Sequence, residues 1–141
     1  MHKHHLIALT TALFMLFSSA LYATTVVIVN TANPDASISK KVAKKIFMGK
    51  KTSTGSTEVI PVDQSEGSTA RDDFYKKAAK KSPEKMKSYW SKMIFSGRAQ
   101  PPKVISGDAA IIDWVKQNKN AIGYVDSSSV NSSVKLILEL P

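Results

Sequence analysis

Apolar positions along the chain fall into four short runs that alternate with segments of helical spacing. The runs are rich in β-branched residues or bounded by turn formers, so they predict strands over residues 25–30, 58–63, 121–125 and 134–140. Pro61 lies inside the second run and predicts an edge or end position, because proline cannot donate a ladder hydrogen bond. Strands that alternate with helices predict a single three-layer α/β domain.

Four segments with helical spacing connect or follow these strands. The first begins at a Ser37 or Ser39 cap and ends at Gly49. The second and third cover about residues 68–81 and 82–97, with Ser82 and Pro83 starting the third, and the fourth begins at a Ser106 cap. The residues expected to face the core are Ile38, Val42, Ile46, Ala70, Phe74, Ala78, Met86, Trp90, Ile94, Ala110, Ile111, Trp114 and Val115.

Residues 1–23 have a different pattern, which predicts a secretory signal peptide. Lys3 and three histidines precede an uncharged apolar run of 16 residues (6–21), and a small residue, Ala23, stands before the expected cleavage point. The alternative is an uncleaved anchor helix, although the run is slightly short of the ~20 residues that span a bilayer. We therefore expect residues 24–141 to form the exported domain and the periplasm to be its location.

The charge balance is strongly basic. The chain carries 20 Lys and Arg against 11 Asp and Glu; without Lys3, 19 basic residues leave a net charge of +8. Such a balance favours anionic partners, either a small anion, phospholipid head groups, lipopolysaccharide or nucleic acid. An exported address disfavours nucleic acid, so none is expected as a partner. The lysine doublets fall mostly opposite the apolar positions, which favours a solvated helix face.

The residue inventory argues against an enzyme. All three histidines lie in residues 1–5 and the chain has no cysteine, so zinc and copper sites are not expected. A serine nucleophile would have no histidine base. Asp72 and Asp73 are adjacent on a helix and diverge by about 100°, which makes them poor partners in acid–base catalysis. We expect no catalysis and no cofactor.

The segment "SEGSTAR" combines features of an anion site at a helix start. Its candidate contacts are Ser65, Gly67, Ser68, Thr69 and Arg71. Free N–H groups and the helix dipole favour an anion there, the hydroxyls can donate, glycine permits close approach, and arginine can neutralise charge. The alternative is ordinary capping, because serine and threonine are the commonest helix caps.

The order of the segments resembles one family. An opening strand followed by "SISKKVAKKIFMGK", "VIPVDQSEGSTARDDF", "YWSKMIFSGRAQPPK" and "NAIGYVD" is similar to the phosphate-binding proteins of ABC importers, which are type II periplasmic binding proteins. The resemblance covers about residues 25–125 and is confined to the second lobe. It implies that fold, phosphate as ligand, the "SEGSTAR" residues as contacts and an ABC permease as a partner.

Two departures from the family pattern qualify this implication. The family's Ser-Gly-Thr is here Ser68-Thr69-Ala70, and Gln64 stands where some members carry an arginine, whereas Arg71 matches the pattern. A half-site without the facing lobe is expected to bind weakly. Two hypotheses follow: a periplasmic phosphate or oxyanion-binding protein, and a cationic envelope interaction module that keeps the lobe fold without solute capture. A homodimer that rebuilds a cleft is a variant of the first.

Overall fold

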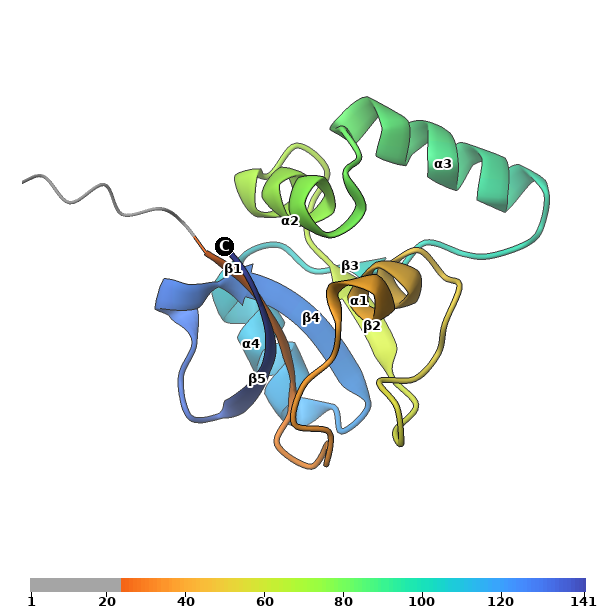
Figure 1. Cartoon of the computed structure of the whole chain (residues 1–141). Coiled ribbons are helices and arrows are strands. Elements are labelled where there is room, and N and C mark those ends of the chain that lie inside the picture. Colours follow the sequence, from red (N-terminus) through yellow and green to blue (C-terminus); the bar gives the residue numbers. More distant parts are fainter. Residues whose placement is uncertain (1–23) are drawn as a thin grey trace, which may run out of the picture.

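The structure is a computed structural model that describes residues 24–141, in which strands and helices alternate (Figure 1). The strands are β1 (Thr25–Asn30), β2 (Ile60–Asp63), β3 (Lys103–Val104), β4 (Ala121–Asp126) and β5 (Val134–Leu140). The helices are α1 (Lys40–Phe47), α2 (Thr69–Ala79), α3 (Pro83–Phe95) and α4 (Asp108–Gln117), with a 3₁₀ turn at Ser127–Ser129. The predicted signal peptide lies outside the described residues and stays a prediction.

The strands form one mixed sheet in the order β3-β2-β4-β1-β5. β2 runs parallel to β3 and β4, whereas β1 is antiparallel to β4 and β5. Thr25 pairs with both Asp126 and Leu140, so the start of β1 meets the ends of β4 and β5. β2 also ends at this end of the sheet, at Asp63, and the chain continues from there into α2 (Figure 1). We call this end of the strands the sheet edge.

Helices cover both faces of the sheet, which confirms the predicted three-layer α/β architecture. Val26 and Ile28 of β1 pack in a cluster with α4, and Val27 and Val29 pack in a second cluster with α1 and α2. The alternation follows from the two-residue period of a strand, which sends successive side chains to opposite faces.

The predicted ends of most elements hold. Ser39 caps α1, Ser82 caps α3, and the first and last strands have the predicted bounds. Pro61 stands near the start of β2, and only Val62 and Asp63 pair with β3. The sequence pattern did not predict β3, a strand of two residues that directly follows Pro101 and Pro102.

Two predictions about helix faces and one about a helix cap were wrong. Ile94 is 47% exposed. Trp90 packs beside Gly49, just after the end of α1, and Ile94 lies one helical turn further along α3, beyond that contact. Ala110 is exposed and Ile112 is buried in its place on α4. Ser106 does not cap α4: the N-cap is Gly107, which makes no side-chain cap bond and has a φ of 94°.

None of the helices in residues 24–141 combines the length and the apolarity that crossing a membrane requires.

Candidate functional site

The candidate site lies where β2 runs into α2 at the sheet edge. Asp63 ends the strand, a short loop follows, and α2 begins at Thr69 with Ser68 as its N-cap. The Ser68 hydroxyl accepts a hydrogen bond from the Arg71 N–H at 3.2 Å, and the Ser68 N–H donates to the Ser65 carbonyl at 3.0 Å. The loop is therefore a capped turn, and the first N–H groups of α2 point back along the helix axis toward it.

The first turn of α2 contains backbone N–H groups without a hydrogen-bond partner among the described residues. The N–H groups of Thr69 and Ala70 have no hydrogen-bond acceptor among residues 24–141. Gly67 has a φ of 85° and open space where a Cβ would stand. Because Gly67 and Thr69 are exposed, the N–H groups can be approached from solvent.

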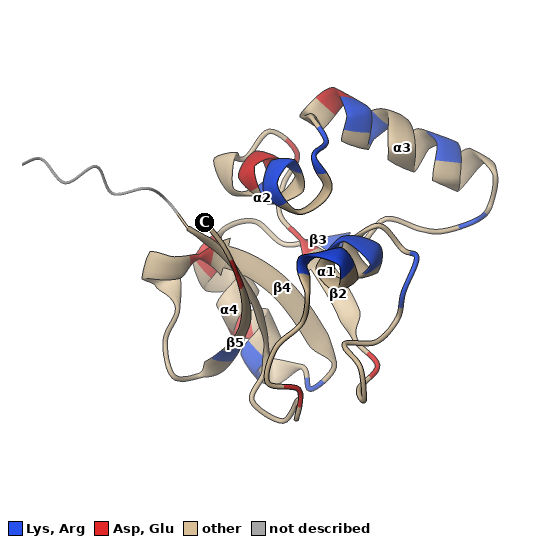
Figure 2. Cartoon of the chain, in the orientation of Figure 1, with Lys and Arg blue, Asp and Glu red and all other residues tan. Residues whose placement is uncertain are grey.

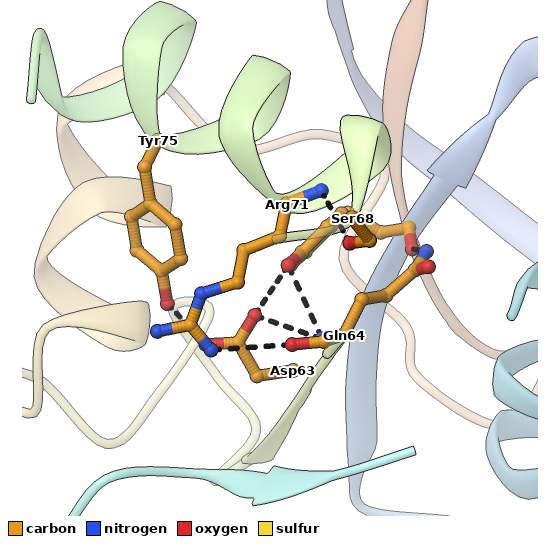
Figure 3. Close-up of polar contacts among 6 residues, drawn as sticks. Asp63, Gln64, Ser68, Arg71 and Tyr75 are labelled. Atoms are coloured by element: carbon orange, nitrogen blue, oxygen red, sulfur yellow. Dashed lines mark hydrogen bonds and ion pairs between the residues drawn. The ribbon is translucent and has the colours of Figure 1, made fainter. Parts of the chain in front are cut away.

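Like Ser68, the predicted contacts Ser65 and Arg71 have partners within the protein. The Ser65 and Ser106 hydroxyl oxygens lie 2.5 Å apart, which joins the loop before α2 to the loop before α4. Arg71 turns away from Ser68 and back toward the sheet (Figure 3). Its guanidinium donates to the Gln64 carbonyl at 3.2 Å and lies 3.4 Å from the Asp63 carboxylate.

Arg71 and Asp63 belong to a buried polar network that the sequence analysis missed. Asp63 is 1% exposed and accepts hydrogen bonds from the Tyr75 hydroxyl at 2.5 Å, the Tyr124 hydroxyl and the Gln64 N–H at 2.9 Å. The Arg71 guanidinium also lies over the Tyr75 ring, 5.4 Å from its centroid. A carboxylate as the last residue of a predicted strand was the one local signal of this network, because Tyr124 lies 61 residues away in the sequence.

Burial sets the ionisation of the two tyrosines. Removal from water raises the pKa of Tyr75 well above its usual value, and the negative charge of Asp63 raises it further. The same two causes, in the same order, raise the pKa of Tyr124. Both hydroxyls therefore stay protonated and serve as donors to Asp63.

Gln64 and Asp108 connect this network to the start of α4. The Gln64 side-chain amide donates to one Asp108 carboxylate oxygen at 2.9 Å and to the Tyr124 carbonyl at 3.0 Å. The other Asp108 oxygen accepts from the Asp126 N–H at 3.1 Å and the Ser129 hydroxyl at 2.8 Å. A carboxylate thus occupies the first turn of α4, the end at which the helix dipole favours negative charge.

Two cavities adjoin the start of α2, and Thr69 and Asp73 line both. The larger measures about 720 Å³ and is lined by Thr69, Asp72, Asp73, Lys76, Lys80, Lys81, Ser82 and Pro83. The smaller measures about 280 Å³ and is lined by Thr25, Thr69, Ala70, Asp73 and Asp126. The Ser128 hydroxyl and N–H donate to Asp126 and lower its pKa. Within residues 24–141, no three His, Cys, Asp or Glu side chains form a group that could hold a metal ion.

The fold is that of one lobe of a substrate-binding protein of phosphate ABC transporters. A phosphate ABC transporter substrate-binding protein from Clostridium perfringens, solved with bound phosphate, is 24% identical over 82% of this chain, with a TM-score of 0.65. An ABC-type phosphate transport receptor from Vibrio cholerae is 20% identical over 82%, with a TM-score of 0.64. PstS from Borrelia burgdorferi is 13% identical over the same share, with a TM-score of 0.61.

The match is to part of each of these proteins. The chain spans 44%, 45% and 46% of the three solved chains, less than half of each. No protein-family model and no curated protein matches the sequence. The comparisons thus confirm the predicted resemblance at the level of fold, and the predicted contact residues stay a prediction.

Proposed function

We propose that this protein is a periplasmic binder of inorganic phosphate or a similar oxyanion, and that the anion binds at the start of α2. The observation that carries the proposal is the pair of N–H groups of Thr69 and Ala70, which lack an acceptor among the described residues and stand beside two hydroxyls. Such a helix start attracts an anion through its N–H groups and its dipole. Structural similarity to transport proteins whose names specify phosphate supports the choice of ligand.

The five predicted residues have different roles in this proposal. Ser65 and Ser68 donate hydroxyl hydrogens, Thr69 supplies its N–H and its hydroxyl, and Gly67 leaves room for the anion. Arg71 contributes positive charge from below the loop, through a guanidinium that Asp63 already neutralises in part.

The charges around the site favour weak binding. Glu66 is exposed beside Gly67, and Asp72 lies in the first turn of α2, so acidic side chains surround the free N–H groups. A second, desolvating wall is needed for tight capture. A second copy of this chain or another lobe can supply it, and an ABC permease would receive the ligand. Sedimentation with and without phosphate tests whether two copies of the chain form a dimer. A protein that stays monomeric under both conditions excludes the dimer.

Calorimetric or ligand-detected NMR titration with phosphate tests the proposal. We expect millimolar binding that weakens in Arg71→Ala and in Thr69→Val, and that is unchanged in the control Arg98→Ala, an exposed arginine after α3. Thr69→Val keeps the exposed position and removes only the hydroxyl, so it reports on binding even where Arg71→Ala destabilises the fold. No binding at millimolar phosphate, or equal affinities in all four proteins, overturns the proposal.

A second candidate function is an envelope interaction module that does not capture solute. The acidic residues around the α2 start and the exposed apolar end of α3 favour it. The immobilised protein should then retain one specific envelope protein or anionic lipid from an envelope extract, and added phosphate should not displace it. Retention of neither contradicts this candidate.

A further inference from the structure

The last turn of α3 exposes two apolar side chains that the domain does not bury. The Phe95 side chain is 96% exposed and Ile94 is 47% exposed. Earlier in the same helix Met86 and Trp90 are buried, so α3 is anchored at one end and free at the other. Figure 1 shows the C-terminal half of α3 projecting beyond the rest of the domain.

The surroundings of Phe95 leave it accessible. Ser91 and Ser88 lie four and seven residues before Phe95, on the same side of the helix, and both are exposed. Small hydroxyl side chains cannot cover the ring. A flat surface can therefore meet Phe95 without displacing another large side chain.

Positive charge accompanies this apolar end. Lys85, Lys87, Lys92 and Arg98 are exposed, and none of them has a carboxylate at ion-pair distance within residues 24–141. Lys92 and Arg98 each lie three residues from Phe95 in the sequence, whereas Lys85 lies beside Glu84, the only acidic residue of α3, in the first turn of the helix. Figure 2 shows the basic residues along α3 and in the loop that follows it.

We infer that the end of α3 docks on a bilayer that contains anionic phospholipid. Phe95 enters the head-group region with Ile94 beside it, and the nearby basic residues Lys92 and Arg98 contact lipid phosphates. The apolar area is one ring and part of a second side chain, which is small beside the roughly 800 Å² per partner of a stable protein interface. Docking on a bilayer does not require an apolar area of that size, because the attraction between basic side chains and lipid phosphates adds to the burial of the aromatic ring. This surface is separate from the proposed phosphate site.

Vesicle sedimentation measures this docking directly. Protein made from the full coding sequence is mixed with phosphatidylcholine vesicles containing about 30% phosphatidylglycerol, and with phosphatidylcholine alone. Mass spectrometry first establishes that all variants share one N-terminus, so that residues 1–23 contribute equally. The variants are Phe95→Ser, Lys92→Glu with Arg98→Glu, and two controls: Ile60→Ser, which replaces another exposed apolar residue (66% exposed), and Lys119→Glu in the turn before β4.

We expect binding to the anionic vesicles that exceeds binding to the neutral ones and falls at high salt. Phe95→Ser should reduce the partition coefficient about tenfold or more, the double charge reversal should reduce it at least as much, and the controls should stay within about twofold. Melting temperatures near wild type should show that the variants fold. Equal binding to both vesicle types, an effect of Ile60→Ser as large as that of Phe95→Ser, or a lipid-free dimer that Phe95→Ser dissociates overturns the inference.

Discussion

The Arg71 guanidinium and the Asp63 carboxylate lie 3.4 Å apart beneath the loop that starts α2. Asp63 comes from the last position of β2 and Arg71 from the first turn of α2, so the pair ties the sheet to the helix. Arg71 also donates to the Gln64 carbonyl. The residue that the sequence suggested as an anion ligand therefore also holds the loop in place.

Replacing Asp63 with asparagine should destabilise the fold strongly. The change leaves the Arg71 charge, 14% exposed, without its partner and puts an amide donor beside two hydroxyl donors. Removing one member of a buried ion pair costs about 3–5 kcal/mol. Urea unfolding measures the difference, and Asp113→Asn on the exposed face of α4 is the matched control, expected within about 0.5 kcal/mol of wild type. A similar loss in both variants would contradict a special role for Asp63.

Because of Tyr75 and Tyr124, we expect the free energy of unfolding to fall at alkaline pH. Their pKa values are raised in the folded state, so the folded protein keeps both protons while the unfolded chain releases them from about pH 10 upward. The contribution of the two tyrosines to the free energy of unfolding is therefore complete below about pH 10 and decreases above it. Urea midpoints of wild type and Tyr124→Phe should differ by a constant amount from pH 6 to 9, and the difference should shrink at pH 11. Lysine titration affects both proteins alike and cancels in the comparison.

Tyr124→Phe itself tests the hydrogen bond to Asp63 at neutral pH. The ring stacks on Phe74 with centroids 4.0 Å apart, and this contact survives the substitution. Only the hydroxyl is lost, so we expect a cost of about 1–3 kcal/mol, the range for a buried acceptor that loses a donor. Tyr89→Phe removes a hydroxyl that donates to the Met48 carbonyl in a partly buried place and should cost less. An equal effect of the two changes would mean that the Asp63 carboxylate is not special.

Much of the fold follows from local patterns in the sequence. β1 and β5 have the predicted bounds because their apolar runs are flanked by turn residues, and the caps Ser39, Ser68 and Ser82 stand where hydroxyl residues precede a helical repeat. β3 could not be predicted this way, because two exposed residues carry no periodicity and form a strand only by pairing with β2. Ile94 was misplaced for a related reason: spacing shows which residues share a face, but not where the neighbouring element ends.

The candidate site was accessible to sequence reasoning only in part. The capped start of α2 was predicted, since a Ser–Thr pair before a helical repeat is a local signal. The partners of Arg71 were not, because its guanidinium could reach either outward to solvent or back to Asp63, and only the burial of β2 decides between them. The same holds for Ser106, whose hydroxyl meets Ser65 across 41 residues instead of capping α4.

Gly123 should tolerate no side chain. A Cβ at this position in β4 would stand 2.9 Å from the Ile111 Cγ2 atom and 3.2 Å from the Val62 Cγ2 atom. Gly123→Ala should therefore cost about 1–3 kcal/mol by overpacking. In a double-mutant cycle measured by urea unfolding, Ile111→Ala together with Gly123→Ala should lose less than the sum of the single losses, because the new methyl fills space that the isoleucine has left. Strict additivity would show that the two positions do not compete for space.

Two substitutions of Ser68 separate helix capping from anion binding. Ser68→Ala removes the acceptor for the Arg71 N–H and should cost about 1 kcal/mol. Ser68→Asp keeps a capping acceptor and suits the positive end of the helix dipole, so its unfolding free energy should stay within about 0.5 kcal/mol of wild type. Its carboxylate, however, would occupy the space proposed for the oxyanion and repel it. Phosphate titration by NMR should therefore show at least a tenfold loss of affinity in Ser68→Asp, the more stable variant, and a smaller loss in Ser68→Ala. Wild-type affinity in the aspartate variant would place any phosphate site away from the start of α2.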